Sequence, residues 1–185
     1  MFPDVRAESL LTATDVERLS LPDKQVELVR GHLVVREPPG TRHGAIAANL
    51  TCLVGAFVRR HGLGVVFAQD AGFKITSDPD TVRAPDVAFV ARERMDRIPA
   101  RGYAALAPDL LAEILSPDDA PAEVLAKVAE WLAAGTKLVW LVDPQRSEVR
   151  VYRRDGSLAV LREMDSLDGE DVLPGFACPL GDVFA

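Results

Sequence analysis

The sequence has few cysteines, no long apolar run and a deficit of positive charge. Its two cysteines, Cys52 and Cys178, lie far apart and form neither a CxxC pair nor a Cys/His zinc spacing. This excludes a disulfide framework and favours a reducing cytoplasm. No apolar run approaches the roughly 20 residues of a membrane-spanning helix, and Met1 to Asp4 lacks the basic start and apolar core of a secretion signal. We therefore expect a soluble cytoplasmic protein that does not enter a membrane.

The charge balance restricts how the protein can interact with nucleic acid. Acidic residues outnumber basic ones by 28 to 21, which gives a net charge of −7. A protein that coats nucleic acid through a general basic surface is therefore excluded. An enzyme that acts on nucleic acid is not, because a carboxylate-rich metal site itself adds negative charge. The length of 185 residues, without an internal repeat or a long linker, predicts a single domain over residues 1–185.

The apolar pattern predicts a mixed sheet with helices on its faces. Segment 41–61 has apolar residues at intervals of three and four, as in an amphipathic helix that ends at Gly62. Short apolar runs at 87–90, 110–115 and 138–142 suit strands that are buried on both faces. The other predicted elements are helices at 15–19 (capped by Thr14) and 121–134 (capped by Asp118 or Asp119), strands at 25–30, 32–35, 64–69, 71–76, 148–153 and 158–162, and a short helix with a surface loop at 91–107. We therefore expect an α/β (α+β) fold with extra hairpins at both ends of the chain.

Two acidic residues lie where the predicted strands are most apolar. Asp86 directly precedes the run 87–90, and Glu113 interrupts the run 110–115. An ionised carboxylate in such a strand costs several kcal/mol unless a cation or hydrogen-bond donors meet it. A structural salt bridge to Lys127 or Lys137 would satisfy Glu113, and so would a metal ion. Because the two acids come from successive strands, their side chains can converge at one edge of the sheet and bind Mg²⁺ or Mn²⁺.

The pair Pro85-Asp86 followed by Glu113-Ile114-Leu115 resembles the PD-(D/E)xK nuclease pattern. Over roughly residues 12–152, the sequence is similar to one branch of these nucleases, the Uma-two family of restriction-endonuclease-like proteins. The segments that carry this resemblance, in order, are Glu27 to Val34, His43, Gly62 to Gly64, Ala84 to Val90, Pro108 to Pro117, Lys127, Ala134-Gly135 and Trp140 to Pro144. The resemblance implies a restriction-endonuclease-like fold, dependence on a divalent metal and cleavage of nucleic acid.

The resemblance also implies roles for individual residues. Asp86, Glu113 and the main-chain carbonyl of Ile114 are the expected metal ligands, and Glu27 is the upstream acid of the site. The last position of the ExK motif falls on Leu115, so the catalytic lysine is expected from the following helix, at Lys127. Helical spacing alone also allows an alternative, in which the aliphatic part of the Lys127 side chain lies along the core and its ammonium reaches water. Glu27 as an exposed strand residue remains an alternative.

Other polar residues are weaker candidates. His43 is a candidate for contact with a substrate phosphate, although a capping or surface role is equally compatible with its place near the start of the helix. Gln69 and Lys74 lie on predicted strands before Asp86. The alternation of apolar and polar residues does not show to which face of the sheet their side chains point. Lys74 is the next candidate if Lys127 is not the catalytic lysine. His32 and His61 are expected at the surface beside turns.

These observations favour a Mg²⁺- or Mn²⁺-dependent endonuclease that acts on DNA. A homodimer is expected, because cutting both strands of a duplex is simplest with matching two-fold symmetry. The apolar residues between 158 and 185 are available to cover a partner or the chain's own sheet. The alternatives are a module that binds nucleic acid or a partner without cleaving, and a structural charge cluster in an unrelated α/β protein.

Overall fold

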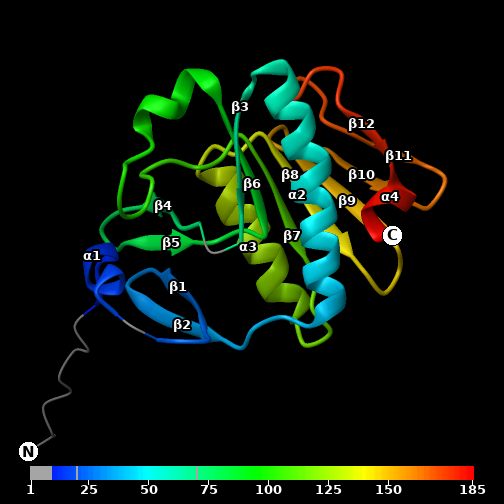
Figure 1. Ribbon diagram of the computed structural model, residues 1–185. Coiled ribbons are helices and arrows are strands. Elements are labelled where there is room, and N and C mark those ends of the chain that lie inside the picture. Colours follow the sequence, from blue (N-terminus) through cyan, green and yellow to red (C-terminus); the bar gives the residue numbers. More distant parts are fainter. Residues whose placement is uncertain (1–9, 20, 70) are drawn as a thin grey trace, which may run out of the picture.

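The computed structural model describes residues 10–19, 21–69 and 71–185. A six-stranded sheet forms its centre (Figure 1), in the order β10-β9-β8-β7-β6-β3. Only β7 and β8 pair in parallel, and the other neighbours are antiparallel. The strands of this sheet are β3 (Gly64–Ala68), β6 (Val87–Ala91), β7 (Leu110–Ile114), β8 (Leu138–Asp143), β9 (Glu148–Arg153) and β10 (Leu158–Leu161). The predicted mixed sheet is therefore present.

Two long helices lie against opposite faces of this sheet. Helix α2 (Thr41–His61) packs with Val87 and Phe89, whereas helix α3 (Pro121–Ala133) packs with the alternate residues Ala88 and Val90. Successive side chains of a strand point to opposite faces, so β6 is apolar throughout because both of its faces are covered. Helix α3 also supplies the crossover that a parallel pair such as β7 and β8 requires.

A second sheet of four strands forms the other wall of the candidate site. Its order is β2-β1-β5-β4, and Leu28 pairs with Val82 where β1 meets β5. The hairpin predicted at 25–35 forms two of its strands. The bounds are β1 (Gln25–Val29), β2 (His32–Arg36), β4 (Phe73–Thr76) and β5 (Thr81–Arg83). Strand β5 was not predicted, because three residues after a turn are too few to show alternation.

The C-terminal segment covers the chain's own core. Strands β11 (Ser166–Asp168) and β12 (Ala177–Pro179) form a small hairpin, followed by helix α4 (Leu180–Phe184). Leu173, Phe176 and Val183 are buried in the cluster that includes α2. Of the two roles open to this segment, covering its own sheet is therefore the one seen in the structure.

Three local predictions were wrong. Thr12, not Thr14, caps α1 (Ala13–Glu17), in a capping box with Asp15. Helix α3 starts after Ala120 without a side-chain cap, because the Asp119 carboxylate instead accepts a hydrogen bond from the Ser116 amide at 2.8 Å. In segment 91–107 the predicted short helix is present as a 3-10 helix, η1 (Arg92–Arg97), but the predicted surface loop contains three buried residues, Ala104, Leu106 and Ala107.

The predicted extent and end of α2 are confirmed. Gly62 adopts the left-handed conformation (φ 63°) and its amide donates to carbonyls of the last turn.

None of the helices in the described residues is long and apolar enough to cross a lipid bilayer.

Candidate active site

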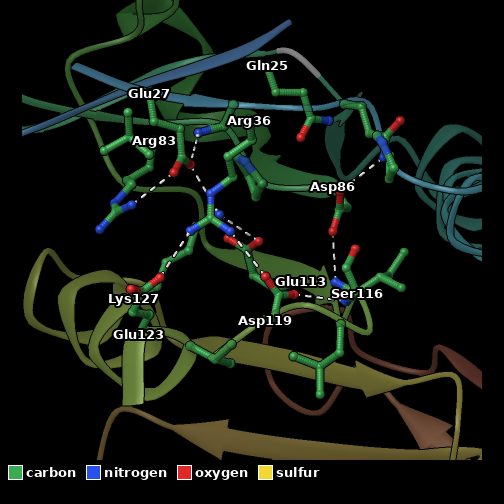
Figure 2. Close-up of a pocket in the computed structure, with 18 of the residues that line it drawn as sticks. Gln25, Glu27, Arg36, Arg83, Asp86, Glu113, Ser116, Asp119, Glu123 and Lys127 are labelled. Atoms are coloured by element: carbon green, nitrogen blue, oxygen red, sulfur yellow. Dashed lines mark hydrogen bonds and ion pairs between the residues drawn. The ribbon is translucent and has the colours of Figure 1, made fainter. Parts of the chain in front are cut away.

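The walls formed by the two sheets and α3 enclose a cavity of about 960 Å³ (Figure 2). Glu27 from β1, Asp86 before β6, Glu113 from β7 and Lys127 from α3 all line it. The structure thus brings four sequence-predicted residues, from four separate elements, into one cleft.

Strand register places Asp86 beside Glu113. Strands β6 and β7 pair with Val87 opposite Ala112, so the residue before β6 faces the end of β7. The Asp86 Oδ2 accepts a hydrogen bond from the Ile114 amide at 2.7 Å, and its Oδ1 accepts one from Gln69 Nε2 at 3.0 Å. These bonds fix the carboxylate at the end of the buried strand.

Glu113 is held by two residues on one face of α3. Lys127 Nζ lies 2.8 Å from its Oε2, and Trp131 Nε1 donates to its Oε1 at 2.8 Å. Lys127 and Trp131 are four residues apart, so the helix presents both to the same spot. Burial, together with the negative charges of Asp86 and Glu27, raises the pKa of Glu113 to about 7, despite the opposing effect of Lys127. The Lys127 ammonium has a pKa above its usual range, because Glu113 and Glu27 outweigh the effect of burial.

Glu27 is buried, which removes the alternative of an exposed strand residue. Its side chain is 8% exposed and contacts three groups: Lys127 Nζ at 3.1 Å, Arg83 at 2.8 Å and the Ala84 amide at 3.1 Å. Burial alone would raise the pKa of Glu27, but Lys127 and Arg83 lower it below its usual value. Glu27 is therefore ionised at neutral pH.

His43 lies beside Asp86. Its Nε2 is 3.3 Å from Asp86 Oδ2, and Gln69 Nε2 is 3.3 Å from its Nδ1. A neutral ring with its proton on Nε2 satisfies both contacts. Burial lowers the pKa of His43, but Asp86 and the Ile114 main chain raise it above its usual value overall. His43 is thus next to two of the groups expected to hold a metal, and is not a surface residue.

The charge count of the cluster suits a divalent cation. Glu27, Asp86, Glu113 and Glu130 bring four carboxylates together, against the two cations Lys127 and Arg83. Burial is the main reason why the pKa of Glu113 is raised, and the negative charges of Asp86 and Glu27 add to it. Within the described residues, no three His, Cys, Asp or Glu side chains are arranged to hold a metal ion by themselves. The donors expected at this site are the Asp86 and Glu113 carboxylates and the Ile114 main-chain carbonyl, and all are hard oxygens of the kind that Mg²⁺ or Mn²⁺ takes.

Comparison with known proteins places this chain in a family. A family model described as "Putative restriction endonuclease" (Uma2) matches residues 13–181. The chain belongs to the Uma2 family. A crystal structure of "a putative nuclease belonging to DUF820" from Anabaena variabilis ATCC 29413 is 23% identical and superposes with a TM-score of 0.80, over 94% of this chain and 97% of that one. The comparison with curated proteins finds no match.

These findings bear on fold and activity in different ways. The structural neighbour is too distant to show more than the fold, and it confirms the restriction-endonuclease-like architecture. The family assignment supports a nuclease.

Two of the candidate lysines lie elsewhere. Lys74 pairs with Asp80 at 2.7 Å, and Lys137 pairs with Asp109 at 3.0 Å. Neither lines the cavity. Of the two partners proposed for Glu113, Lys127 is the one that the structure shows. His32 and His61 are exposed, as expected.

Sequence reasoning missed Arg83 and Glu130, which form part of the same cluster. Arg83 donates to Glu130 Oε2 from Nε and NH2, at 3.0 and 2.6 Å. A signal was available for Glu130, since it follows Lys127 by three residues and so shares its helix face. Arg83 comes three residues before Asp86 in a strand too short to recognise, so its burial was not predictable.

Proposed function

We propose that the protein is a metal-dependent endonuclease that hydrolyses phosphodiester bonds in DNA. The observation that carries the proposal is the convergence of Asp86, Glu113, Glu27 and Lys127 in one cleft. Membership of a family described as restriction endonucleases supports the same reaction class.

Asp86, Glu113 and the main-chain carbonyl of Ile114 would hold Mg²⁺ or Mn²⁺. The bound ion would polarise a phosphoryl oxygen and lower the pKa of an attacking water. Each carboxylate retains acceptor capacity, because its two oxygens offer about four lone-pair positions and the described contacts use only part of them.

The remaining residues would act directly on substrate or on one another. Lys127 offers a compact ammonium that stabilises the negative charge developing on the phosphate. Glu27, 3.1 Å from that ammonium, orients it, and as the upstream acid also adds to the negative field that attracts the metal. His43 would donate a hydrogen bond to a substrate phosphate once its Nε2 leaves Asp86, which it contacts at 3.3 Å.

The test combines metal binding with cleavage. Calorimetric titration with Mn²⁺ should give a binding signal that Asp86→Asn abolishes, and the same variant should not cleave a plasmid DNA substrate. Asp118→Asn is the matched control, because Asp118 is an exposed acid that lines the same cavity. Unchanged Mn²⁺ binding in Asp86→Asn would overturn the metal assignment. A parallel assay with single-stranded RNA decides between the two nucleic acids.

We further propose that residues 1–185 act as one domain in a homodimer whose two sites cut the two strands of a duplex. Sedimentation at micromolar concentration should give twice the chain mass of 20.0 kDa. A mass of one chain would contradict the dimer without affecting the proposed chemistry.

One observation favours a module that binds a partner other than nucleic acid and does not cleave. Each Lys or Arg side chain lining the cavity is paired with an acid, so the described cleft offers a phosphate backbone no free cation. Mn²⁺ binding without cleavage of DNA or RNA would establish this alternative.

A further inference from the structure

Arg83 joins the two walls of the cleft. It is the last residue of β5, and its side chain is 9% exposed. From there NH1 reaches Glu27 on β1 at 2.8 Å, while Nε and NH2 reach Glu130 on α3 at 3.0 and 2.6 Å. A planar guanidinium can hold two carboxylates at once, whereas an ammonium cannot keep this geometry.

Both carboxylates that Arg83 binds are competitors for Lys127. Glu130 follows Lys127 by one helical turn, the spacing at which a free glutamate and lysine pair on a helix surface. Glu27 already contacts Lys127, but through Oε1 alone, since Arg83 occupies Oε2. The same Lys127 ammonium is closest to Glu113, at 2.8 Å.

We propose that Arg83 is a positioning residue that withholds Glu130 and one oxygen of Glu27 from Lys127, so that the ammonium stays at Glu113. Figure 2 labels Arg83, Glu27, Lys127 and Glu113 in the cleft. Without Arg83, four carboxylates would surround one ammonium, and Glu130 on the same helix would draw it away from β7. Arg83 touches neither metal nor substrate in this scheme. Its role depends on a catalytic Lys127, so the proposal rests on the proposed function.

The test uses Arg83→Lys, which keeps the positive charge but loses the paired contacts of Nε and Nη2 with Glu130. We expect kcat to fall about a hundredfold with little change in KM, as for other small misplacements of a catalytic group. Adding Arg83→Lys to Lys127→Ala should cause no further loss, because the residue that it positions is gone. A further loss of the same size in that background would show a general structural role and overturn the proposal.

A rescue variant separates competition from simple loss of stability. Glu130→Gln removes the competing charge, so the double variant Arg83→Lys/Glu130→Gln should recover at least tenfold of the lost kcat. Failure of this rescue would overturn the proposal. Arg94→Lys is the matched control, because Arg94 pairs with another buried carboxylate, Asp109, at 2.9 Å and lies outside the cavity. It should lower the melting temperature without lowering kcat.

A crystal structure of Arg83→Lys gives a readout that needs no activity. Lys127 Nζ should leave Glu113 Oε2 and pair with Glu130. If it remains at Glu113, the positioning role is wrong even if the parent cleaves DNA. If the parent cleaves nothing but the ammonium moves as expected, the proposed function fails while the coupling of Arg83 to Lys127 stands.

Discussion

Burial controls the ionisation of Glu113 more than its ion pair does. The carboxylate is 12% exposed, and the pKa of about 7 lies above the usual value although Lys127 is 2.8 Å away. At neutral pH the metal-free side chain is therefore a mixture of protonated and ionised forms. A cation bound at Asp86 and Glu113 would favour the ionised form, so proton release should accompany metal binding.

The role of Lys127 can be tested against a lysine of the same chain. Lys127→Ala should lower cleavage about a hundredfold, which corresponds to roughly 3 kcal/mol of transition-state stabilisation by one preorganised group. Lys74→Ala should leave cleavage unchanged, because Lys74 pairs with Asp80 and lies outside the cavity. Single-turnover rates on plasmid DNA measure both.

A second substitution distinguishes an ammonium from positive charge in general. Lys127→Arg should restore little activity, since a planar guanidinium does not fit the space between Glu113 and Glu27. Full activity in Lys127→Ala would show that the lysine is structural, whereas full activity in Lys127→Arg would show that any positive charge at this position suffices.

Trp131 offers a test of how firmly Glu113 must be held. Trp131→Phe removes the hydrogen bond to Glu113 Oε1 and should weaken Mn²⁺ binding by about tenfold, as is common when a group behind a metal ligand is lost. Trp140→Phe is the control, because Trp140 is equally buried and its Nε1 has no partner among the described residues. Equal Mn²⁺ affinities in the two variants, measured by calorimetry, would show that this hydrogen bond does not matter.

At the scale of elements, long periodic or apolar segments were predictable and short or long-range features were not. Helix α2 and strands β6 to β9 follow from patterns that burial on one or two faces imposes. The start of α1 depends on which of two nearby threonines turns toward the backbone, and α3 starts without a side-chain cap, so local sequence decides neither start.

The candidate site likewise has some residues that the sequence predicts and some that only the fold reveals. Asp86 and Glu113 stood out because a charge within an apolar strand is costly, and Lys127 was expected only from the family resemblance. The bridge from Arg83 to Glu27 and Glu130 joins residues 56 and 47 positions apart. Nothing in local spacing links them, so only the fold reveals the bridge.

Asp109 should contribute strongly to the stability of the central sheet. It is fully buried at the start of β7, and it binds Arg94 at 2.9 Å, Lys137 at 3.0 Å and the Ala91 amide at 3.0 Å. Asp109→Asn should lower the free energy of unfolding by about 3–5 kcal/mol at pH 7, the usual cost of removing one partner from a buried pair. Glu37→Gln, at an exposed ion pair with Lys24, should cost less than about 1 kcal/mol.

The free energy of unfolding that is lost in Asp109→Asn should also depend on pH. Burial raises the pKa of Asp109, but the Ala91 amide, Lys137 and Arg94 lower it below its ordinary value overall. Its stabilising effect is therefore present above the unfolded pKa and disappears as the pH falls toward the folded pKa. Urea denaturation should show a smaller difference between parent and variant at pH 3 than at pH 7. An equal difference at both would contradict the ion-pair explanation.

For the whole molecule, the acids of the proposed metal site should lower stability when no metal is bound. The described acids of the cluster exceed its cations by two. This negative charge adds to the effect of burial in raising the pKa of Glu113. Its folded pKa of about 7 lies above the usual value of a glutamate, so its contribution is present below the unfolded pKa and is lost as the pH rises through 7. The loss is at most about 3 kcal/mol, at 1.36 kcal/mol for each pKa unit.

A divalent metal should reverse this loss, and the size of the effect should depend on pH. A ligand at a hundredfold excess over its Kd stabilises by about 2.7 kcal/mol, but protons compete for Glu113 at low pH. The rise in melting temperature caused by Mn²⁺ should therefore be larger at pH 8 than at pH 5.5. Glu113→Gln should melt higher than the parent at pH 8 without metal and should lose the response to Mn²⁺, whereas Asp118→Asn should keep it. A Mn²⁺ response that is the same at both pH values would place the metal away from Glu113.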